Sequence, residues 1–379
     1  MSHSGFREAN KIACQNSLRY ELIPNDSVLI LLTARAFACH RAQVLHSLRH
    51  AFIMKLAHLY SSILLLLALS QPASAEWFSL EDAKMGTRVE VQFWLDEDKP
   101  EVAASLLAES MAEFDRIEAL MSTYIDSSEM SRVNARSAEE PQEISAELFD
   151  LLQQALDLSV KTEGAFDITY DSVGYLYDFR KKQRPDPMEI AEHLSSVNYR
   201  NVVLDESEGT VHFTQPGVRI NLGGIAKGYS VEQVIKLLAR SGVEHALATA
   251  GGDTRILGDR RDKPWIVGIR DPDNSEAIFT RLALVNEAVS TSGDYERFFI
   301  EDGKRYHHIL SPTDGRPIEG VRSVTIIGPD ATLTDGLSTS VFVMGPEAGI
   351  ALVDTLPAYE AIIIVSDGTW FYSAGLSSK

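Results

Sequence analysis

One segment of the chain combines residues that could hold an anion. Residues 219–238 read RINLGGIAKGYSVEQVIKLL, so an extended run ends at Gly223-Gly224, Lys227 follows, and the pattern becomes helical. A glycine turn before a helix presents backbone N–H groups, and the helix N-terminus favours negative charge. The segment is not G-x-G-x-x-G, and no Ser or Thr follows Lys227 as a P-loop requires. It therefore predicts an anion-binding loop outside these two motifs.

Asp335 and Thr339 could hold a cation. They lie four residues apart in an expected helix, so their side chains share one face. A carboxylate and a hydroxyl are hard oxygen ligands, which suit Mg²⁺ better than zinc. Spacing alone is more typical of a helix N-terminus capped by Asp335 with Thr339 exposed. His307 and His308 are consecutive strand residues that face opposite ways, which argues against a zinc hydrolase.

Polar and glycine clusters recur at the expected strand ends. Each alone is ordinary turn chemistry, but so many in one chain favour a site. The clusters are Gly164 to Asp167, Asn221 to Lys227, Gly251 to Asp253, Thr291 to Asp294, His307-His308 and Thr334 to Thr339. No G-x-S-x-G elbow occurs. Tyr124, Phe166, Tyr170 and Tyr175 could stack on a flat ring, although such aromatics are more often core residues.

The charge of the chain limits its partners. The formal net charge is −19, and residues 1–75 contribute seven basic and three acidic residues, which leaves about −23 on residues 76–379. Such a surface repels nucleic acid, so we expect no nucleic-acid partner. It also repels polyanions, so a phosphorylated ligand would need a metal ion or backbone donors.

The first 75 residues are expected to lie outside the folded domain. Residues 54–75 read MKLAHLYSSILLLLALSQPASA, which is typical of a cleavable signal peptide. A secretory signal must come first, so residues 1–53 are interpreted as a mis-assigned start or a disordered segment. Both cysteines, Cys14 and Cys39, lie there, and no lipobox cysteine marks the cleavage site. We expect a periplasmic protein whose domain covers residues 76–379.

The remaining pattern predicts an α+β fold with a mostly antiparallel sheet and flanking helices, rather than a Rossmann sheet. Residues 181–188 read as a polar, proline-containing loop. Helical spacing covers residues 101–121, 145–163, 228–241, 332–343 and 346–355. Strands are expected at 85–95, 200–204, 210–214, 245–249, 254–258, 264–270, 278–284, 287–291, 296–301, 305–310, 323–328, 360–365 and 369–373.

Taken in order, the motifs resemble those of the ApbE-type FAD:protein FMN transferases, and they span essentially all of residues 76–379. The matching pieces are MGT at 85–87, MSTYIDSSEMSRVN at 121–134, GAFDIT at 164–169, INLGGIAKGYSVEQV at 220–234, AGGDTRILG at 250–258, STSGDYERFF at 290–299, GKRYHHILSPTDGRPI at 303–318 and SVTIIGPDATLTDGLSTSVFVMGPEAG at 323–349.

The resemblance implies a fold that holds FAD in a pocket between two sheet regions, with Mg²⁺ on the pyrophosphate. It implies transfer of FMN from FAD to a threonine hydroxyl of a target protein, with release of AMP. The implied partner is a periplasm-facing, threonine-bearing subunit of a redox complex, so contact with a membrane would be only through that partner.

The resemblance also implies roles for particular residues. The flavin nucleotide would be lined by Met85, Tyr124, Ala165, Phe166 and Asp167. FAD would further be contacted by Asn221, Lys227 and Ile309, and Mg²⁺ would be held by the carbonyl of Gly224, Asp335 and Thr339. The threonine needs a proton acceptor, for which His308 is the first candidate, because its ordinary pKa is near neutrality, and Asp294 the second.

Two departures from the family pattern and two other functions stay open. The family usually has Asp where this chain has Asn221 and Ser311. Asn221 keeps hydrogen bonding without the charge, and Ser311 removes a carboxylate beside His308. An FAD pyrophosphatase that gives FMN and AMP would use the same pocket. A periplasmic FAD-binding carrier would not need a metal at the scissile bond, so Asp335 and Thr339 argue against it.

Overall fold

The computed structural model describes residues 76–96, 99–272, 274 and 277–377. The chain divides into two units, Met1–Pro72 and Ala73–Lys379, and the described residues all belong to the second. The expectations for residues 1–53 and for the signal peptide at 54–75 therefore lie outside the described residues.

An eight-stranded sheet is the largest element, and all its neighbouring strands run antiparallel. The alternation of β2 explains its place, because Val89, Val91 and Phe93 are fully buried while the residues between them are not. The strand order is β1 (Glu76–Lys84), β2 (Thr87–Leu95), β6 (Ala246–Ala250), β7 (Asp253–Leu257), β10 (Ala288–Gly293), β13 (Val321–Gly328), β14 (Glu360–Val365) and β15 (Trp370–Tyr372).

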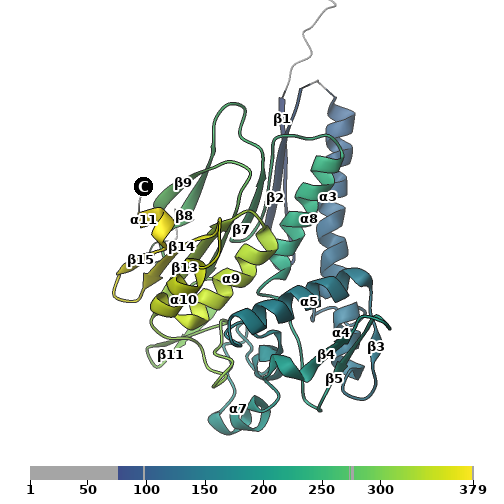
Figure 1. Cartoon of the computed structure of the whole chain (residues 1–379), viewed down its shortest axis with the longest axis vertical. Coiled ribbons are helices and arrows are strands. Elements are labelled where there is room, and N and C mark those ends of the chain that lie inside the picture. Colours follow the sequence, from purple (N-terminus) through teal and green to yellow (C-terminus); the bar gives the residue numbers. More distant parts are fainter. Residues whose placement is uncertain (1–75, 97–98, 273, 275–276, 378–379) are drawn as a thin grey trace, which may run out of the picture. The chain divides into compact units, whose positions relative to one another are not determined.

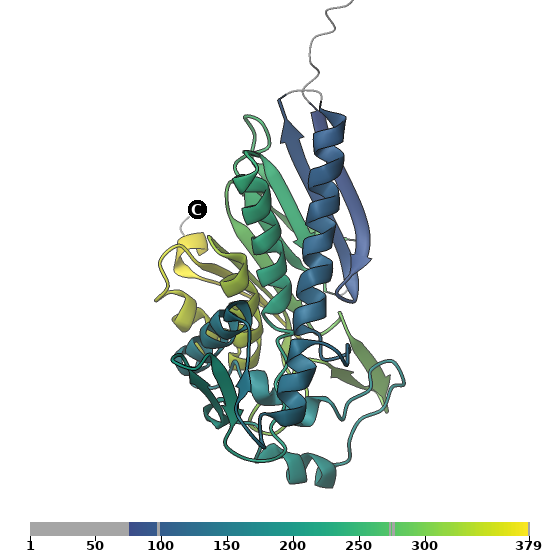
Figure 2. The ribbon, with the colours of Figure 1, turned by 90° about the vertical axis from the view of Figure 1, so that its right-hand side faces the viewer.

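Long helices cover one face of this sheet, as Figures 1 and 2 show. Helix α8 (Ala226–Arg240) packs on β6 and β7, and α9 (Ala331–Met344) packs on β10 and β13. Helix α3 (Pro100–Met121) lies beside α8, and α10 (Pro346–Val353) lies beside α9. The direct contact between α8 and α9 brings two distant parts of the sequence together.

Smaller elements complete the unit. Beside α4 (Glu129–Arg136) and α5 (Ala146–Lys161), a three-stranded sheet has the order β3 (Gln142–Glu143), β5 (Thr210–Phe213), β4 (Val202–Asp205). Two hairpins are formed by β8 (Trp265–Arg270) with β9 (Ile278–Leu284), and by β11 (Phe298–Glu301) with β12 (Lys304–His307). The short helices are η1 (Ile168–Tyr170), α6 (Asp171–Gly174), α7 (Pro187–Leu194), η2 (Tyr199–Asn201) and α11 (Ala374–Ser377).

The largest core cluster joins the eight-stranded sheet to the layer formed by α4, α5 and the three-stranded sheet. Leu151 of α5, Leu337 and Phe342 of α9, and Ile326 of β13 are all fully buried in it. Burying one such side chain contributes roughly 1.5–3 kcal/mol. This shared core fixes α9 between the two layers, so residues of α9 that face α8 are held in place. None of the described helices is long and apolar enough to cross a bilayer.

The predicted α+β, mostly antiparallel class is confirmed, one local expectation was wrong, and two elements were not predicted. The chain turns at Met85-Gly86, and a strand precedes this turn where none was predicted. Helix α7 starts at Pro187, inside the predicted loop, and Asp186 and Glu189 form a capping box there. The eight-residue helix α4 was also missed; the side chain of Ser128 caps it by accepting from the N–H of Ser131.

Candidate active site

The contact between α8 and α9 depends on a glycine. A Cβ on Gly228 would lie 2.1 Å from the carbonyl oxygen of Ala331 and 2.6 Å from Cβ of Asp335. The two backbones can therefore approach this closely only without a side chain at this position. The N–H of Gly228 donates to Oδ2 of Asp335 over 2.9 Å. The approach brings the start of α8 against the first two turns of α9.

Lys227 lies between two carboxylates, and we call Lys227, Asp253 and Asp335 the buried lysine cluster. Nζ of Lys227 bonds Oδ2 of Asp253 and lies 3.5 Å from Oδ1 of Asp335. The carboxylate side chains are only 1% and 3% exposed, whereas that of Lys227 is 29% exposed. Lys227 is therefore not a free positive charge for FAD, because two carboxylates already face it.

Burial and mutual charge shift the pKa values of this cluster. Burial, and then the charge of Asp253, raise the pKa of Asp335 to about 7, against the opposing effect of Lys227. Burial acts to lower the pKa of Lys227, but the two carboxylates outweigh it and hold that pKa above its ordinary value. Lys227 is therefore charged at neutral pH, and the cluster carries a surplus of negative charge that favours a cation.

The residues predicted to hold a metal do come together. A Cβ on Gly224 would lie 3.2 Å from Oγ1 of Thr339, and Thr339 lies one helical turn after Asp335. Asp330, not Asp335, caps α9, by accepting from the N–H of Leu333, so the capping interpretation of Asp335 was wrong. Thr339 is half-buried rather than exposed.

The donor set fits a hard cation. It consists of oxygen atoms only, as Mg²⁺ prefers. Oδ1 of Asp253 adds a further anionic oxygen, which is buried and has no hydrogen-bond partner among the described residues. Within the same residues, no three His, Cys, Asp or Glu side chains gather around one point that could hold a metal ion. A metal here would therefore depend on the hydroxyl and carbonyl oxygens as well as on the carboxylates.

His308 directly follows β12 and is the candidate proton acceptor. The backbone N–H of His308 donates to the carbonyl oxygen of Arg297 over 3.1 Å. Nδ1 of its imidazole is buried without a hydrogen-bond partner in the described residues. Burial, and then the charges of Arg297, His307 and Lys227, lower the pKa of His308 to about 3. The ordinary pKa that made His308 the first candidate is therefore not kept in the fold, and the imidazole is neutral at physiological pH with a free lone pair.

His307 and Asp294 are engaged in the structure. Nε2 of His307 donates to the carbonyl oxygen of Ile318 over 2.7 Å, so the two adjacent histidines have separate surroundings. Oδ1 and Oδ2 of Asp294 accept from Arg305 and Arg322 over 2.9 and 2.6 Å. As the second candidate base, Asp294 would have to release one of these arginines. His308 therefore stays the stronger candidate.

The side chains predicted to line the nucleotide differ in how open they are. Tyr124 is 81% exposed, so its ring is free to meet a ligand. Phe166 is buried, and its ring lies 3.3 Å from the position of a Cβ on Gly224. Ala165 is half-buried, and Ile309 is buried next to His308. Met85 has a φ of 53°, and its N–H donates to Oε2 of Glu118 over 2.8 Å.

Asp167 and Asn221 shape the backbone around the site. Asp167 accepts from Thr169 and from the N–H of Tyr199, so both its oxygens are used inside the protein. Oδ1 of Asn221 accepts from the N–H of Gly223 over 2.8 Å, and its Nδ2 donates to Asp171 over 3.2 Å. Asn221 thus holds the glycine turn, and direct contact of either residue with a nucleotide stays a prediction.

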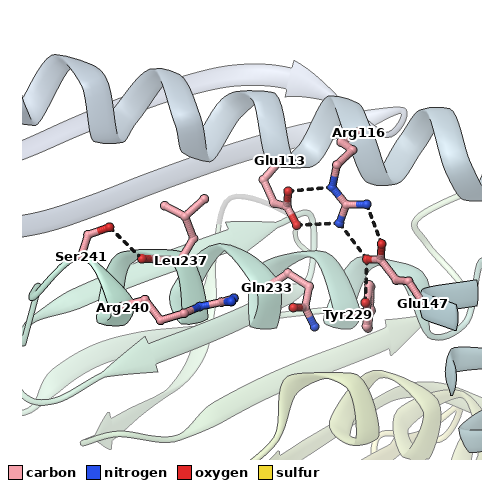
Figure 3. Close-up of a pocket in the computed structure, with 8 residues that line it drawn as sticks. All are labelled: Glu113, Arg116, Glu147, Tyr229, Gln233, Leu237, Arg240 and Ser241. Atoms are coloured by element: carbon pink, nitrogen blue, oxygen red, sulfur yellow. Dashed lines mark hydrogen bonds and ion pairs between the residues drawn. The ribbon is translucent and has the colours of Figure 1, made fainter.

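The larger of two described cavities lies elsewhere, along α3 and α8, with a volume of about 550 Å³ (Figure 3). Arg116 there bonds Glu113 and Glu147, and Tyr229 also donates to Glu147. None of the predicted site residues lines this cavity, so the larger cavity and the predicted catalytic residues lie in different places. The smaller cavity, about 240 Å³, includes Met85. We place the site by its chemistry, at the contact between α8 and α9.

Sequence reasoning missed two residues at this site. Asp253 occurs in the Gly251 to Asp253 cluster, but only the fold shows that it bonds Lys227. Arg297 lies in the STSGDYERFF motif and gave no separate signal. The structure places its backbone against His308, and its charge affects the pKa values of both His308 and Lys227.

Solved structures share this fold. The ApbE protein of Thermotoga maritima superposes with a TM-score of 0.73 at 33% identity, covering 80% of this chain and 99% of that one. The flavin transferase ApbE of Vibrio cholerae gives 0.72 at 29% identity, with the same coverage of both chains. The class defined by fold and site is therefore that of the ApbE-like α+β proteins.

Sequence comparisons name the family. The ApbE family pattern matches residues 85–363, and this chain belongs to the ApbE family. An FAD:protein FMN transferase of Vibrio cholerae is 33% identical over 331 residues, or 84% of this chain and 96% of the relative. One of Treponema pallidum is 33% identical, covering 80% and 88%. The resemblance seen in the motifs is confirmed.

Proposed function

We propose that this protein is an Mg²⁺-dependent FAD:protein FMN transferase that attaches FMN to a threonine hydroxyl of a target protein and releases AMP. The observation that carries the proposal is the meeting of Gly224, Asp335 and Thr339 at the α8–α9 contact, with the free imidazole nitrogen of His308 near Lys227. The family membership and the names of the relatives support the same activity.

The chain's own residues account for the transfer step. The threonine oxygen forms a bond to the FMN phosphorus of FAD, and the bond from that phosphorus to the bridging oxygen breaks, so AMP leaves with the bridging oxygen. The threonine proton moves to Nδ1 of His308, which is neutral and has no other partner among the described residues. Such transfers need positioning and charge neutralisation more than covalent help from the protein.

The metal site is part of the proposal. The carboxylate of Asp335, the hydroxyl of Thr339 and the carbonyl of Gly224 would hold Mg²⁺, which supplies Lewis-acid neutralisation of the diphosphate when bound. Lys227 keeps Asp253 and Asp335 in place, because it faces both carboxylates. Gly228 sets the distance between the helices, so the oxygen donors are held before a ligand arrives.

The proposal includes the setting of the reaction. The signal-peptide pattern at residues 54–75 supports export to the periplasm. The acceptor would be a threonine-bearing subunit of a redox complex that faces this compartment, and any contact with a membrane would be through that subunit.

The first test follows AMP release and flavin fluorescence of a threonine-bearing periplasmic acceptor domain after incubation of the purified protein with FAD and Mg²⁺. The expected result is equal amounts of AMP and labelled acceptor, with both lost on EDTA treatment or in Asp335→Ala. His308→Ala should bind FAD normally but transfer about 10²–10⁴-fold more slowly, the usual contribution of one general base.

Other outcomes point to the other functions. AMP without labelled acceptor, with several threonine-bearing domains tried, would favour an FAD pyrophosphatase. Tight FAD binding with no AMP at all would favour a flavin carrier and contradict the enzymatic proposal. Normal transfer by His308→Ala would exclude His308 as the proton acceptor while leaving the activity itself in place.

A further inference from the structure

Arg297 occupies a position at the site that no role assigned so far explains. It begins the segment that forms the β11–β12 hairpin, and its carbonyl oxygen accepts the N–H of His308. A Cβ on Gly86 would lie 3.4 Å from Nη2 of Arg297. The guanidinium therefore reaches from His308 toward the turn at Met85-Gly86, which borders the smaller cavity. Two regions predicted to meet FAD are thus connected by one cationic side chain.

The charge of Arg297 is not paired with any other residue in the described part of the protein. Its guanidinium makes no hydrogen bond or ion pair with the residues that the structure describes, and the residue is exposed. Lys227, by contrast, is held by two carboxylates, and Arg305 and Arg322 are held by Asp294. At this site, Arg297 is therefore the cation that is available to a ligand.

A diphosphate needs such a cation. The formal charge is −19, and the buried lysine cluster has more carboxylates than cations, so the surroundings oppose an anion. A guanidinium has a planar fork of donors that matches two phosphate oxygens. Its neighbours are the groups that a bound diphosphate would approach: the imidazole of His308 and the ammonium of Lys227, whose pKa values both reflect the charge of Arg297.

We infer that Arg297 binds the diphosphate of FAD and makes the site prefer FAD to flavins without phosphate. The inference rests on the proposed function only in taking FAD as the ligand. Arg297 is a binding residue in this role, so its loss should weaken binding before it affects the chemical step.

The test compares Arg297→Gln with wild type in direct binding of FAD and of riboflavin, which lacks phosphate, by flavin fluorescence on the full chain with Mg²⁺ present. Loss of a charged hydrogen bond predicts about 10- to 100-fold weaker FAD binding. Riboflavin binding should stay within twofold. Arg297→Lys should recover part of the loss, because it restores the charge without the fork.

Arg281→Gln is the matched control. Arg281 is an exposed residue of β9 outside the site motifs, and its substitution removes the same charge. It should leave the binding of both ligands unchanged. Unchanged thermal unfolding of all variants would show that folding is intact, as expected for exposed positions.

Three results would overturn the inference. FAD affinity of Arg297→Gln within twofold of wild type would show that no phosphate contact exists. Equal weakening of FAD and riboflavin would place Arg297 at the flavin ring instead. Equal weakening of FAD binding by Arg281→Gln would show that the effect comes from net charge and not from a contact of Arg297. Wild type that binds FAD without transferring FMN would contradict the proposed function alone, whereas wild type that does not bind FAD would contradict both.

Discussion

The molecule contains two clusters in which one cation lies between two carboxylates, in different surroundings. In the buried lysine cluster, Lys227 lies between Asp253 and Asp335, whose side chains are at most 3% exposed. In what we call the open arginine cluster, Arg116 lies between Glu113 and Glu147, and these three side chains are 18–46% exposed (Figure 3).

The surroundings give the two clusters opposite electrostatic behaviour. Burial raises the pKa of Asp335 to about 7, whereas the hydrogen bond from Arg116 lowers the pKa of Glu147. Arg116 can satisfy two carboxylates at once with its fork, while Lys227 is a compact point charge. A cation between two acids is thus partly exposed in one place and lies between two buried carboxylates in the other. Burial and the geometry of the cation together make the difference.

The largest expected difference comes from removing the cation. Lys227→Met would leave two buried carboxylates facing each other, and breaking a buried pair typically destabilises by about 3–5 kcal/mol. We expect a loss of this order at pH 8 in chemical denaturation of the metal-free protein. Saturating Mg²⁺ should restore part of it, because a bound cation would replace the lost charge. A loss below 1 kcal/mol without metal would show that the cluster behaves like an exposed one.

A second change separates helices α8 and α9, whose contact buries the lysine cluster. Gly228→Ala would place a methyl group 2.1 Å from the carbonyl oxygen of Ala331, so α8 and α9 must separate. Overpacking of this kind typically costs about 1–3 kcal/mol. Transfer should fall more than stability does, since the donors of α9 move away from Lys227. Gly242→Ala, where a Cβ would meet nothing within 4 Å but φ is 85°, separates backbone strain from crowding. Equal effects of both changes would contradict this account.

The two clusters should respond to pH with opposite signs. Because the pKa of Asp335 is raised from an ordinary 3.8 to about 7, the folded metal-free protein holds a proton in this interval that the unfolded chain has released. Its unfolding free energy should therefore fall as pH rises from about 4 to 7, by up to about 1.4 kcal/mol per pH unit. Glu147 acts oppositely, since its stabilisation is present above the ordinary value of 4.5 and is lost as pH decreases.

Chemical denaturation in EDTA between pH 4.5 and 8 tests this sign. Asp335→Asn should gain stability relative to wild type as pH rises, because it lacks the titrating carboxylate. Glu147→Gln should show its largest deficit at high pH. Parallel pH profiles of Asp335→Asn and wild type would mean that Asp335 titrates near its ordinary value.

The smallest effect is expected in the open cluster. Arg116→Met removes two ion pairs whose arginine is 46% exposed, and such pairs contribute about 0.2–1 kcal/mol each. We expect a modest loss of stability that shrinks in high salt, with no change in transfer rate. A change in transfer rate would show that the cavity along α3 and α8 takes part in function.

Much of the fold could be read from local pattern. Residues 278–284 were predicted as a strand and form β9 with the same bounds, because alternation and β-branched residues act locally. Strand β1 was missed because its mixed sequence EWFSLEDAK becomes a strand only by pairing with β2 at the sheet edge. Helix α7 was missed because Pro187 suggested a loop, although proline suits the first helical turn.

The site was predicted in part, for a physical reason. Motifs in sequence order gave Asp335, Thr339 and His308, since each sits in a recognisable stretch. The partner of Lys227 could not be read, because Asp253 reaches it only through the packing of α8 on β7. The low pKa of His308 likewise results from burial and from Arg297, which no local pattern reveals. Contacts between elements, and the desolvation they cause, are what sequence reasoning lacks.

The pairing of β2 with β6 has a consequence for how the chain folds. Val89 pairs with Ala250, so the first hairpin finds its second neighbour only after most of the chain has been made. A two-stranded hairpin alone is marginally stable in water, and closing so long a loop is slow. The N-terminal strands should therefore be among the last to acquire lasting protection from hydrogen exchange during refolding. A fragment that ends before β6 should leave them unprotected.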